Sequence, residues 1–270
     1  MVVITAVLGY GMASRATGRP FAWLPLVYLI IGTAMTSMGA CALNMYLERE
    51  IDGAMARTRK RPLPSRRLTP EEALFFALIS FSWGFAQLAV FCGPLVAGLS
   101  LLTALIYVFA YTPLKRQGPL AVWVGAFPGA IPPLMGWAAV TGGLDFKALT
   151  LFAVLFAWQF PHFLALAYIY QQDYLRVGFR FLPRSERLTG LSIGVGAAIV
   201  AFVSLMPFAL GLVSVFYLLG AVVLGVGFVA TAVPNMAQLT SKRARRTFLA
   251  SIIYLPLLLL LLGLDGVLLS

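Results

Sequence analysis

The chain has 270 residues, of which 61% are hydrophobic and only 11% are charged. This composition excludes an ordinary soluble domain and indicates that most of the molecular surface faces lipid. The formal net charge of +11 would suit nucleic-acid binding, but cationic loops beside membrane spans explain it better in so apolar a chain. We therefore expect no nucleic-acid partner.

Apolar runs close to the roughly 20 residues that cross a bilayer recur along the chain. They predict nine helices, at residues 1–13, 21–47, 72–92, 95–113, 120–140, 146–170, 188–209, 211–233 and 247–264. The first run is short, which indicates a truncated or misassigned start rather than a cleaved signal peptide, because no positive segment precedes it. The expected fold class is all-α: a polytopic transmembrane helical bundle that forms a single domain over residues 1–270.

The loop charges predict the orientation, because Lys and Arg accumulate on the cytoplasmic side of inserted helices. The second, fourth, sixth and eighth loops hold all 20 Lys and Arg residues except Arg15, Arg19 and Lys147. We therefore expect an integral protein of the cytoplasmic (inner) membrane, with the N-terminus and the even-numbered loops inside and the C-terminus outside.

Asn44, Glu48 and Asp52 follow the second span at a spacing of four, which places them on one helix face with about 6 Å of rise per step. Two carboxylates at this spacing repel each other and are costly to desolvate at a membrane boundary. A hard cation would remove this cost, and such oxygen ligands suit Mg²⁺ completed by substrate phosphates. The alternative is that the acids pair with Arg49 or Arg57 on a solvated helix end.

Asp173 is a second acidic feature, at the end of the sixth span. By loop parity it emerges on the same face as the first acidic group, so we expect the two to converge across the bundle. Cations on this face suit a diphosphate, although loop cations also set topology and meet lipid headgroups. The candidates for diphosphate binding are Arg57, Arg61, Lys115 and Arg116.

The segment 44–64 resembles the first acidic motif of the UbiA-type intramembrane prenyltransferases, and within that superfamily it is most similar to the protoheme IX farnesyltransferases. Three further stretches agree with this branch: Tyr-Thr-Pro-Leu-Lys-Arg at 111–116, the Gly/Pro-rich run at 129–142, and Pro-His-Phe-Leu-Ala-Leu-Ala at 161–167, which leads into Asp173. The resemblance extends over nearly the whole chain.

The resemblance implies nine transmembrane helices around a central cavity, with Mg²⁺ bridging Asn44, Glu48, Asp52 and Asp173 to farnesyl diphosphate. The farnesyl group would pass to a vinyl group of protoheme IX (heme B), and the product would be heme O, a precursor for terminal oxidases. Heme A synthase or terminal-oxidase assembly factors are implied partners. The resemblance also favours the four cations as diphosphate ligands rather than topology signals alone.

This chain departs from the family pattern at several places, and the Lys-Pro-Arg segment that typically introduces the first helix of the family is absent from it. Glu48 stands where Asp is more usual, Gln172 where a cation is common, and residues 178–183 (Gly-Phe-Arg-Phe-Leu-Pro) where a Gly-Ile/Val-Pro-Met-Leu-Pro-like stretch is typical. His162 is the only histidine; it either contacts the porphyrin or its iron, or hydrogen-bonds inside the bundle. Tyr111 is a candidate cavity residue whose ring could shield a carbocation.

Two other functions stay open at this point. A prenyltransferase acting on an aromatic quinone precursor would use the same chemistry, and cavity shape rather than sequence distinguishes the acceptors. A non-enzymatic carrier or heme-handling membrane protein is the second alternative. A transporter should show broken helices at mid-membrane, whereas the acidic residues here gather at one face.

Overall fold

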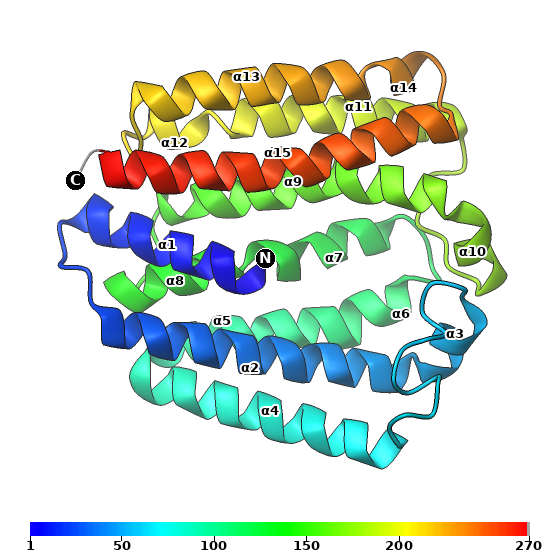
Figure 1. Cartoon of the computed structure of the whole chain (residues 1–270), viewed down its shortest axis with the longest axis horizontal. Helices are drawn as coiled ribbons and strands as arrows, with labels where there is room; N and C mark the ends of the chain where they lie inside the picture. Colours follow the sequence, from blue (N-terminus) through cyan, green and yellow to red (C-terminus); the bar gives the residue numbers. More distant parts are fainter. Residues whose placement is uncertain (269–270) are drawn as a thin grey trace.

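The computed structural model describes the backbone over residues 1–268 and the side chains up to residue 266, and this part of the chain is helical without strands (Figure 1). The helices, with one π-helical segment η1, are α1 (Val2–Thr17), α2 (Trp23–Leu47), α3 (Arg49–Ala54), α4 (Pro70–Phe91), α5 (Pro94–Leu105), η1 (Ile106–Tyr111), α6 (Thr112–Leu114), α7 (Leu120–Ala130), α8 (Pro132–Thr141), α9 (Ala148–Ile169), α10 (Gln171–Arg176), α11 (Glu186–Val203), α12 (Met206–Ala209), α13 (Val215–Ala232), α14 (Pro234–Ala237) and α15 (Ser241–Leu268).

The predicted all-α transmembrane bundle is confirmed. Within the described residues, eight helical segments are long and apolar enough to cross a membrane, and α1, with 16 residues, is a shorter apolar helix. The eight segments are Trp23–Leu47, Pro70–Phe91, Pro94–Leu114, Leu120–Thr141, Ala148–Ile169, Glu186–Ala209, Val215–Ala237 and Ser241–Gly266.

The predicted start of the last span, at residue 247, is wrong, because α15 begins at Ser241. A search for apolar runs omits the first turns of this helix, which carry Lys242, Arg243, Arg245 and Arg246. Lys and Arg are good helix formers, and their long side chains reach the membrane boundary from a helix end. These cations therefore lie on a helix rather than in a loop.

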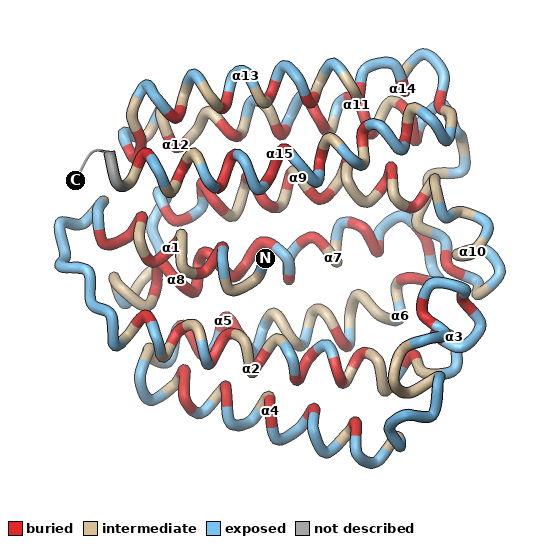
Figure 2. The backbone as a smooth tube through the Cα atoms, in the orientation of Figure 1, coloured by how far each residue is buried: buried red, intermediate tan, exposed pale blue. Residues whose placement is uncertain are grey.

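Proline divides the fifth predicted span into two helices. α7 ends at Ala130 and α8 begins at Pro132, which is followed by Pro133. Neither proline has an N–H to donate to the preceding turn, so the helix breaks there. The break lies near the centre of the bundle, where these two helices are largely buried (Figure 2).

Small residues allow the helices to approach closely in a lipid environment. A Cβ added at Gly136 of α8 would lie 1.9 Å from the carbonyl oxygen of Ala6 on α1, and one at Gly84 of α4 would lie 2.8 Å from Thr36 N on α2. Large apolar side chains instead cover the outside, such as Phe202 and Val90, each 73% exposed. This distribution fits a polytopic integral membrane protein.

The helices run back and forth between two ends of the bundle (Figure 1). α3, α6, α10 and α14 lie together at one end, where the cation-rich connections also gather, and we call it the cationic end. The predicted gathering of the even-numbered loops at one end is confirmed.

Candidate active site

A cavity of about 420 Å³ opens among α2, α3, η1, α7 and α9 and extends to the cationic end of the bundle. One part of its wall is charged or polar, and the remainder is apolar and rich in aromatic rings. The charged and amide side chains at the cationic end are Asn44, Glu48, Asp52, Arg57, Arg61 and Lys115.

Asn44, Glu48 and Asp52 form one buried stack across the junction of α2 and α3. Glu48 is the joining residue, and it keeps the helical hydrogen-bond spacing: its N–H donates to Asn44 O at 3.0 Å, and the Asp52 N–H donates to Glu48 O at 2.8 Å. The three residues are 4%, 5% and 1% exposed. The structure thus keeps the spacing that the sequence suggested, although the dihedral angles of Glu48 itself are not helical.

Glu48 is paired with Lys115, which lies just beyond α6. The Lys115 Nζ atom is 2.9 Å from Oε1 and 2.8 Å from Oε2 of Glu48, and Asn44 Nδ2 donates to Oε2 at 3.0 Å. The Thr112 hydroxyl donates to Asn44 Oδ1 at 2.7 Å and thereby orients the amide. Burial lowers the pKa of the Lys115 ammonium, while the Glu48 carboxylate opposes that shift.

Asp52 is paired with Arg61, whose Nη1 lies 2.7 Å from Asp52 Oδ2. The backbone carbonyl of Asp52 accepts a hydrogen bond from the Thr58 hydroxyl at 2.8 Å, which ties the cationic loop back onto α3. The alternative pairing of the acids with Arg49 or Arg57 is wrong. Arg49 instead donates to the carbonyl of its neighbour Tyr46 and lies over that ring, outside the cavity lining of the described chain.

Asp173 and Arg116 lie outside the cavity lining that the described residues form. Asp173 is on α10 at the cationic end and is 3.7 Å from Arg176 of the same helix, while its neighbour Tyr174 does line the cavity. Arg116 is exposed, one residue beyond buried Lys115. The expected metal role of Asp173 and the expected diphosphate role of Arg116 stay predictions.

His162 faces α15 and is not among the described residues that line the cavity. Its Nδ1 is 2.8 Å from Ser251 Oγ, and its ring stacks on Trp158 with centroids 4.4 Å apart. Of the two roles considered for this residue, the hydrogen bond inside the bundle is the one present here. Tyr111 does line the cavity, with the Lys115 ammonium 4.7 Å from its ring centroid.

Several cavity residues were not among the sequence candidates. Gln159 is buried on α9, and its Nε2 donates to the carbonyls of Ala126 and Leu155 at 2.9 and 3.2 Å. A glutamine inside an apolar span was a usable signal, because polar groups in membrane helices usually face the interior. Phe179 and Phe181 also line the cavity, but an aromatic residue in a loop carries no comparable signal.

The charged part of the cavity can hold a polyanion together with a hard metal ion. Arg57, Arg61 and Lys115 outnumber the two carboxylates, and Asn44, Glu48 and Asp52 supply oxygen atoms of the kind that Mg²⁺ binds. No group of three or more His, Cys, Asp or Glu side chains able to hold a metal occurs among the described residues. A metal ion here would therefore need oxygen ligands from the substrate as well.

The chain matches the model of the UbiA prenyltransferase family over residues 2–260. It is 37% identical to the protoheme IX farnesyltransferase of Koribacter versatilis, covering 98% of this chain and 89% of that one. It is 42% identical to the protein of the same name from Solibacter usitatus, covering 90% of this chain and 84% of that one. It is 41% identical to the protoheme IX farnesyltransferase of Sorangium cellulosum, covering 96% of this chain and 94% of that one.

Solved structures show the same fold at lower identity. A digeranylgeranylglyceryl phosphate synthase aligns with a TM-score of 0.83 at 16% identity, covering 98% of this chain and 93% of that one. A UbiA homolog from Archaeoglobus fulgidus bound to GPP and Mg²⁺ aligns with a TM-score of 0.62 at 11% identity, with 97% and 96% covered. From the sequence match, the relatives and the fold together, this chain belongs to the UbiA prenyltransferase family.

Proposed function

We propose that this protein is a protoheme IX farnesyltransferase, which transfers a farnesyl group from farnesyl diphosphate to a vinyl group of protoheme IX and so forms heme O. Relatives of this name are 37 to 42% identical over at least nine-tenths of the chain. Within the molecule, one observation carries the proposal: a single cavity combines buried carboxylate–cation pairs with an apolar, aromatic wall. An isoprenoid diphosphate has a charged diphosphate head and an apolar prenyl chain, which match these two parts of the cavity.

The ion pairs of the cavity supply the ligands for this substrate. Lys115 and Arg61 are held in the cavity by Glu48 and Asp52, so both cations are already placed to bind diphosphate oxygens. A guanidinium group binds such oxygens in bidentate fashion, and an ammonium binds them as a point charge. Arg57 adds a third positive charge to the same wall.

The oxygens of Asn44, Glu48 and Asp52 fit Mg²⁺, which proteins usually bind with one or two carboxylates and substrate phosphates. The Archaeoglobus fulgidus homolog, which has the same fold, is bound to GPP and Mg²⁺, and this supports Mg²⁺ as the metal ion. Bound Mg²⁺ would neutralise charge on the departing diphosphate. We include Asp173 in the proposed metal site, because α10 carries it at the cationic end beside Tyr174, a cavity residue.

We further propose that the cationic end faces the cytoplasm and that the protein lies in the cytoplasmic (inner) membrane. The support is the excess of Lys and Arg at this end, which inserted helices keep on the cytoplasmic side. The diphosphate head group of farnesyl diphosphate is charged and water-soluble. A site at this end would therefore receive the substrate from the cytoplasm. The product would pass to a heme A synthase or a terminal-oxidase assembly factor.

The test is to incubate the purified protein with farnesyl diphosphate and heme B, with Mg²⁺ or with EDTA, and to analyse the hemes by mass spectrometry. We expect a farnesylated heme only with Mg²⁺. Unmodified heme together with a farnesylated aromatic quinone precursor, added in a parallel reaction, would reassign the acceptor. Failure to release diphosphate with either acceptor would overturn the assignment as a transferase.

A further inference from the structure

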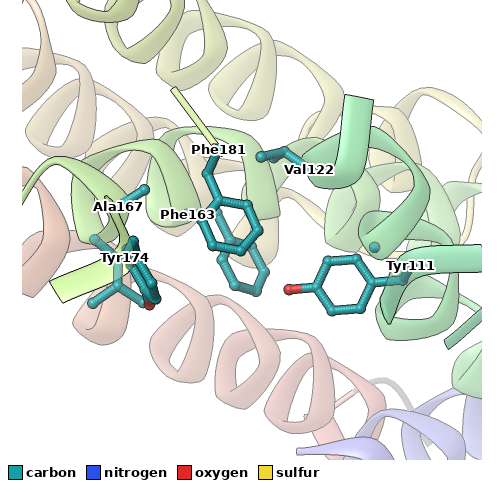
Figure 3. A pocket seen from close by; sticks show the side chains of 8 residues that line it. Tyr111, Val122, Phe163, Ala167, Tyr174 and Phe181 are labelled. Carbon is teal, nitrogen blue, oxygen red and sulfur yellow. The ribbon is translucent and has the colours of Figure 1, made fainter. Parts of the chain in front are cut away.

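Four aromatic rings from four different segments gather at the cationic end of the cavity. Tyr111 comes from η1, Phe163 from α9, Tyr174 from α10, and Phe181 from the connection between α10 and α11. Figure 3 shows them around one small pocket that adjoins the main cavity. We call these four residues the aromatic wall.

Tight packing holds the aromatic wall in place. A Cβ at Gly125 of α7 would lie 2.7 Å from the Tyr111 ring, so this ring rests directly on a helix backbone. Tyr174 and Phe181 meet edge to face, with centroids 5.0 Å apart and an interplanar angle of 81°. Rings fixed in this way need no reorganisation to receive a ligand.

The connection that carries Phe181 is also fixed. The N–H of Arg180 donates to the carbonyl of Lys115 at 2.9 Å, which joins this segment to the lysine that pairs with Glu48. Phe179 is 4% exposed, and its ring centroid lies 5.6 Å from that of Phe181. The segment is therefore part of the wall of the active cavity rather than a free surface loop.

A cation already lies over one ring of this wall and near a ring adjacent to it. The Lys115 ammonium lies 4.7 Å from the Tyr111 centroid and 5.7 Å from the Phe179 centroid. The face of an aromatic ring carries partial negative charge and attracts a nearby cation, most strongly where water is excluded. The site therefore places electron-rich rings next to the group that we expect to bind the diphosphate.

We propose that Phe181, the member of the aromatic wall carried by the connection between α10 and α11, contacts the first isoprene unit of the bound diphosphate and stabilises its allylic cation. This inference rests on the proposed function. The bond between C1 and the diphosphate oxygen breaks, and its electron pair leaves with the diphosphate, so positive charge spreads over the allylic carbons beside the rings. The vinyl π electrons then form the new carbon–carbon bond. Water captures the cation left on the neighbouring carbon, and its proton passes to the diphosphate.

The test compares two unreactive ligands that differ in charge at the position of the cation. One is a diphosphate whose allylic carbon is replaced by an ammonium nitrogen, and the other is farnesyl thiodiphosphate, which has a neutral isoprenoid. For Phe181→Leu we expect about tenfold weaker binding of the ammonium ligand, within the range for a desolvated cation–π contact. Binding of the thiodiphosphate should change less than twofold, and kcat should fall while KM stays near its original value.

Two further variants act as controls. Phe181→Tyr keeps a ring and should bind both ligands as the unmodified protein does, while Phe202→Leu alters a 73% exposed phenylalanine on α11 and should change neither affinity. Equal losses for both ligands in Phe181→Leu, or no loss, would overturn the cation-stabilising role. If the unmodified protein bound neither ligand, the proposed function itself would fail, whereas an incorrect heme acceptor would leave this binding comparison unaffected.

Discussion

Glu48 and Lys115 are 67 positions apart in the chain and form a buried ion pair. Both charges are desolvated, which costs several kcal/mol per ion, and a buried pair contributes little net stability relative to apolar residues. Its presence is understandable if the partners separate in the working enzyme, with Lys115 on diphosphate and Glu48 on Mg²⁺. The pair would then be the ligand-free state of a binding site.

We predict that Glu48→Gln lowers Mg²⁺-dependent farnesyl transfer about a hundredfold and destabilises the fold by about 3 kcal/mol, because Lys115 is left buried without its counter-ion. Glu48→Asp should stay active, since it keeps the charge. The measurements are heme O formation against Mg²⁺ concentration and thermal unfolding in detergent.

The double variant Glu48→Gln, Lys115→Met separates stability from chemistry. It removes both buried charges, so we expect its unfolding temperature to return towards that of the unmodified protein while turnover stays low. Recovery of turnover along with stability would show that neither the Glu48 carboxylate nor the Lys115 ammonium is needed for the reaction.

Asp52 and Asp173 are the next carboxylates to test. We predict that Asp52→Asn and Asp173→Asn each lower kcat about a hundredfold, a change of about 2.7 kcal/mol in the barrier, because each would remove one negative ligand from the metal. The control is Glu71→Gln, an exposed acid at the start of α4. Normal kcat for Asp173→Asn at saturating Mg²⁺ would remove α10 from the metal site.

At the scale of elements, the contact between α7 and α9 shapes the interior of the cavity. Gly129 on α7 leaves room for the side chain of Gln159 on α9, and a Cβ at position 129 would lie 2.4 Å from Gln159 Oε1. The amide nitrogen of Gln159 in turn donates to Ala126 O, so the two helices are joined at the same level. A buried side chain with a direct hydrogen bond to the neighbouring helix sets their separation.

We predict that Gly129→Ala destabilises the protein by about 1–3 kcal/mol, because the added methyl group displaces Gln159 or separates the helices. Gly98→Ala on α5 is the matched control, since a Cβ there meets no atom within 4 Å. Thermal unfolding of both variants in the same detergent checks this. A loss of similar size at both positions would indicate a general effect of replacing helical glycines rather than the close contact.

At the scale of the whole molecule, the cations define one end of the bundle and the predicted orientation follows from them. Arg67 lies in the loop at the cationic end, and Lys147 precedes α9 near the opposite end; both are exposed. We predict that, in a Cys41→Ser, Cys92→Ser background, an impermeant thiol reagent labels Lys147→Cys in intact cells. Arg67→Cys should react only after the membrane is opened. Labelling in the reverse order would contradict the orientation.

The fold class and the first acidic motif can be predicted from the sequence alone. Both depend on local patterns: apolar runs of membrane-spanning length, and the four-residue spacing of Asn44, Glu48 and Asp52, which the helical hydrogen bonds preserve across the junction of α2 and α3. The gathering of the cation-rich connections at one end could also be predicted from the sequence, because successive helices that cross a membrane alternate in direction.

Which cations pair with the acids, and which residues form the remaining cavity wall, depend on how the helices pack and could not be predicted from the sequence. Asp52 and Glu48 pair with Arg61 and Lys115 rather than with arginines nearer in the sequence. The folding of the chain, not sequence distance, brings each pair into the same buried space. Phe181 and Gln159 reach one cavity from a loop and a distant helix, and His162 turns to Ser251 instead. These outcomes depend on helix rotation and packing, which the period of a uniformly apolar span does not specify.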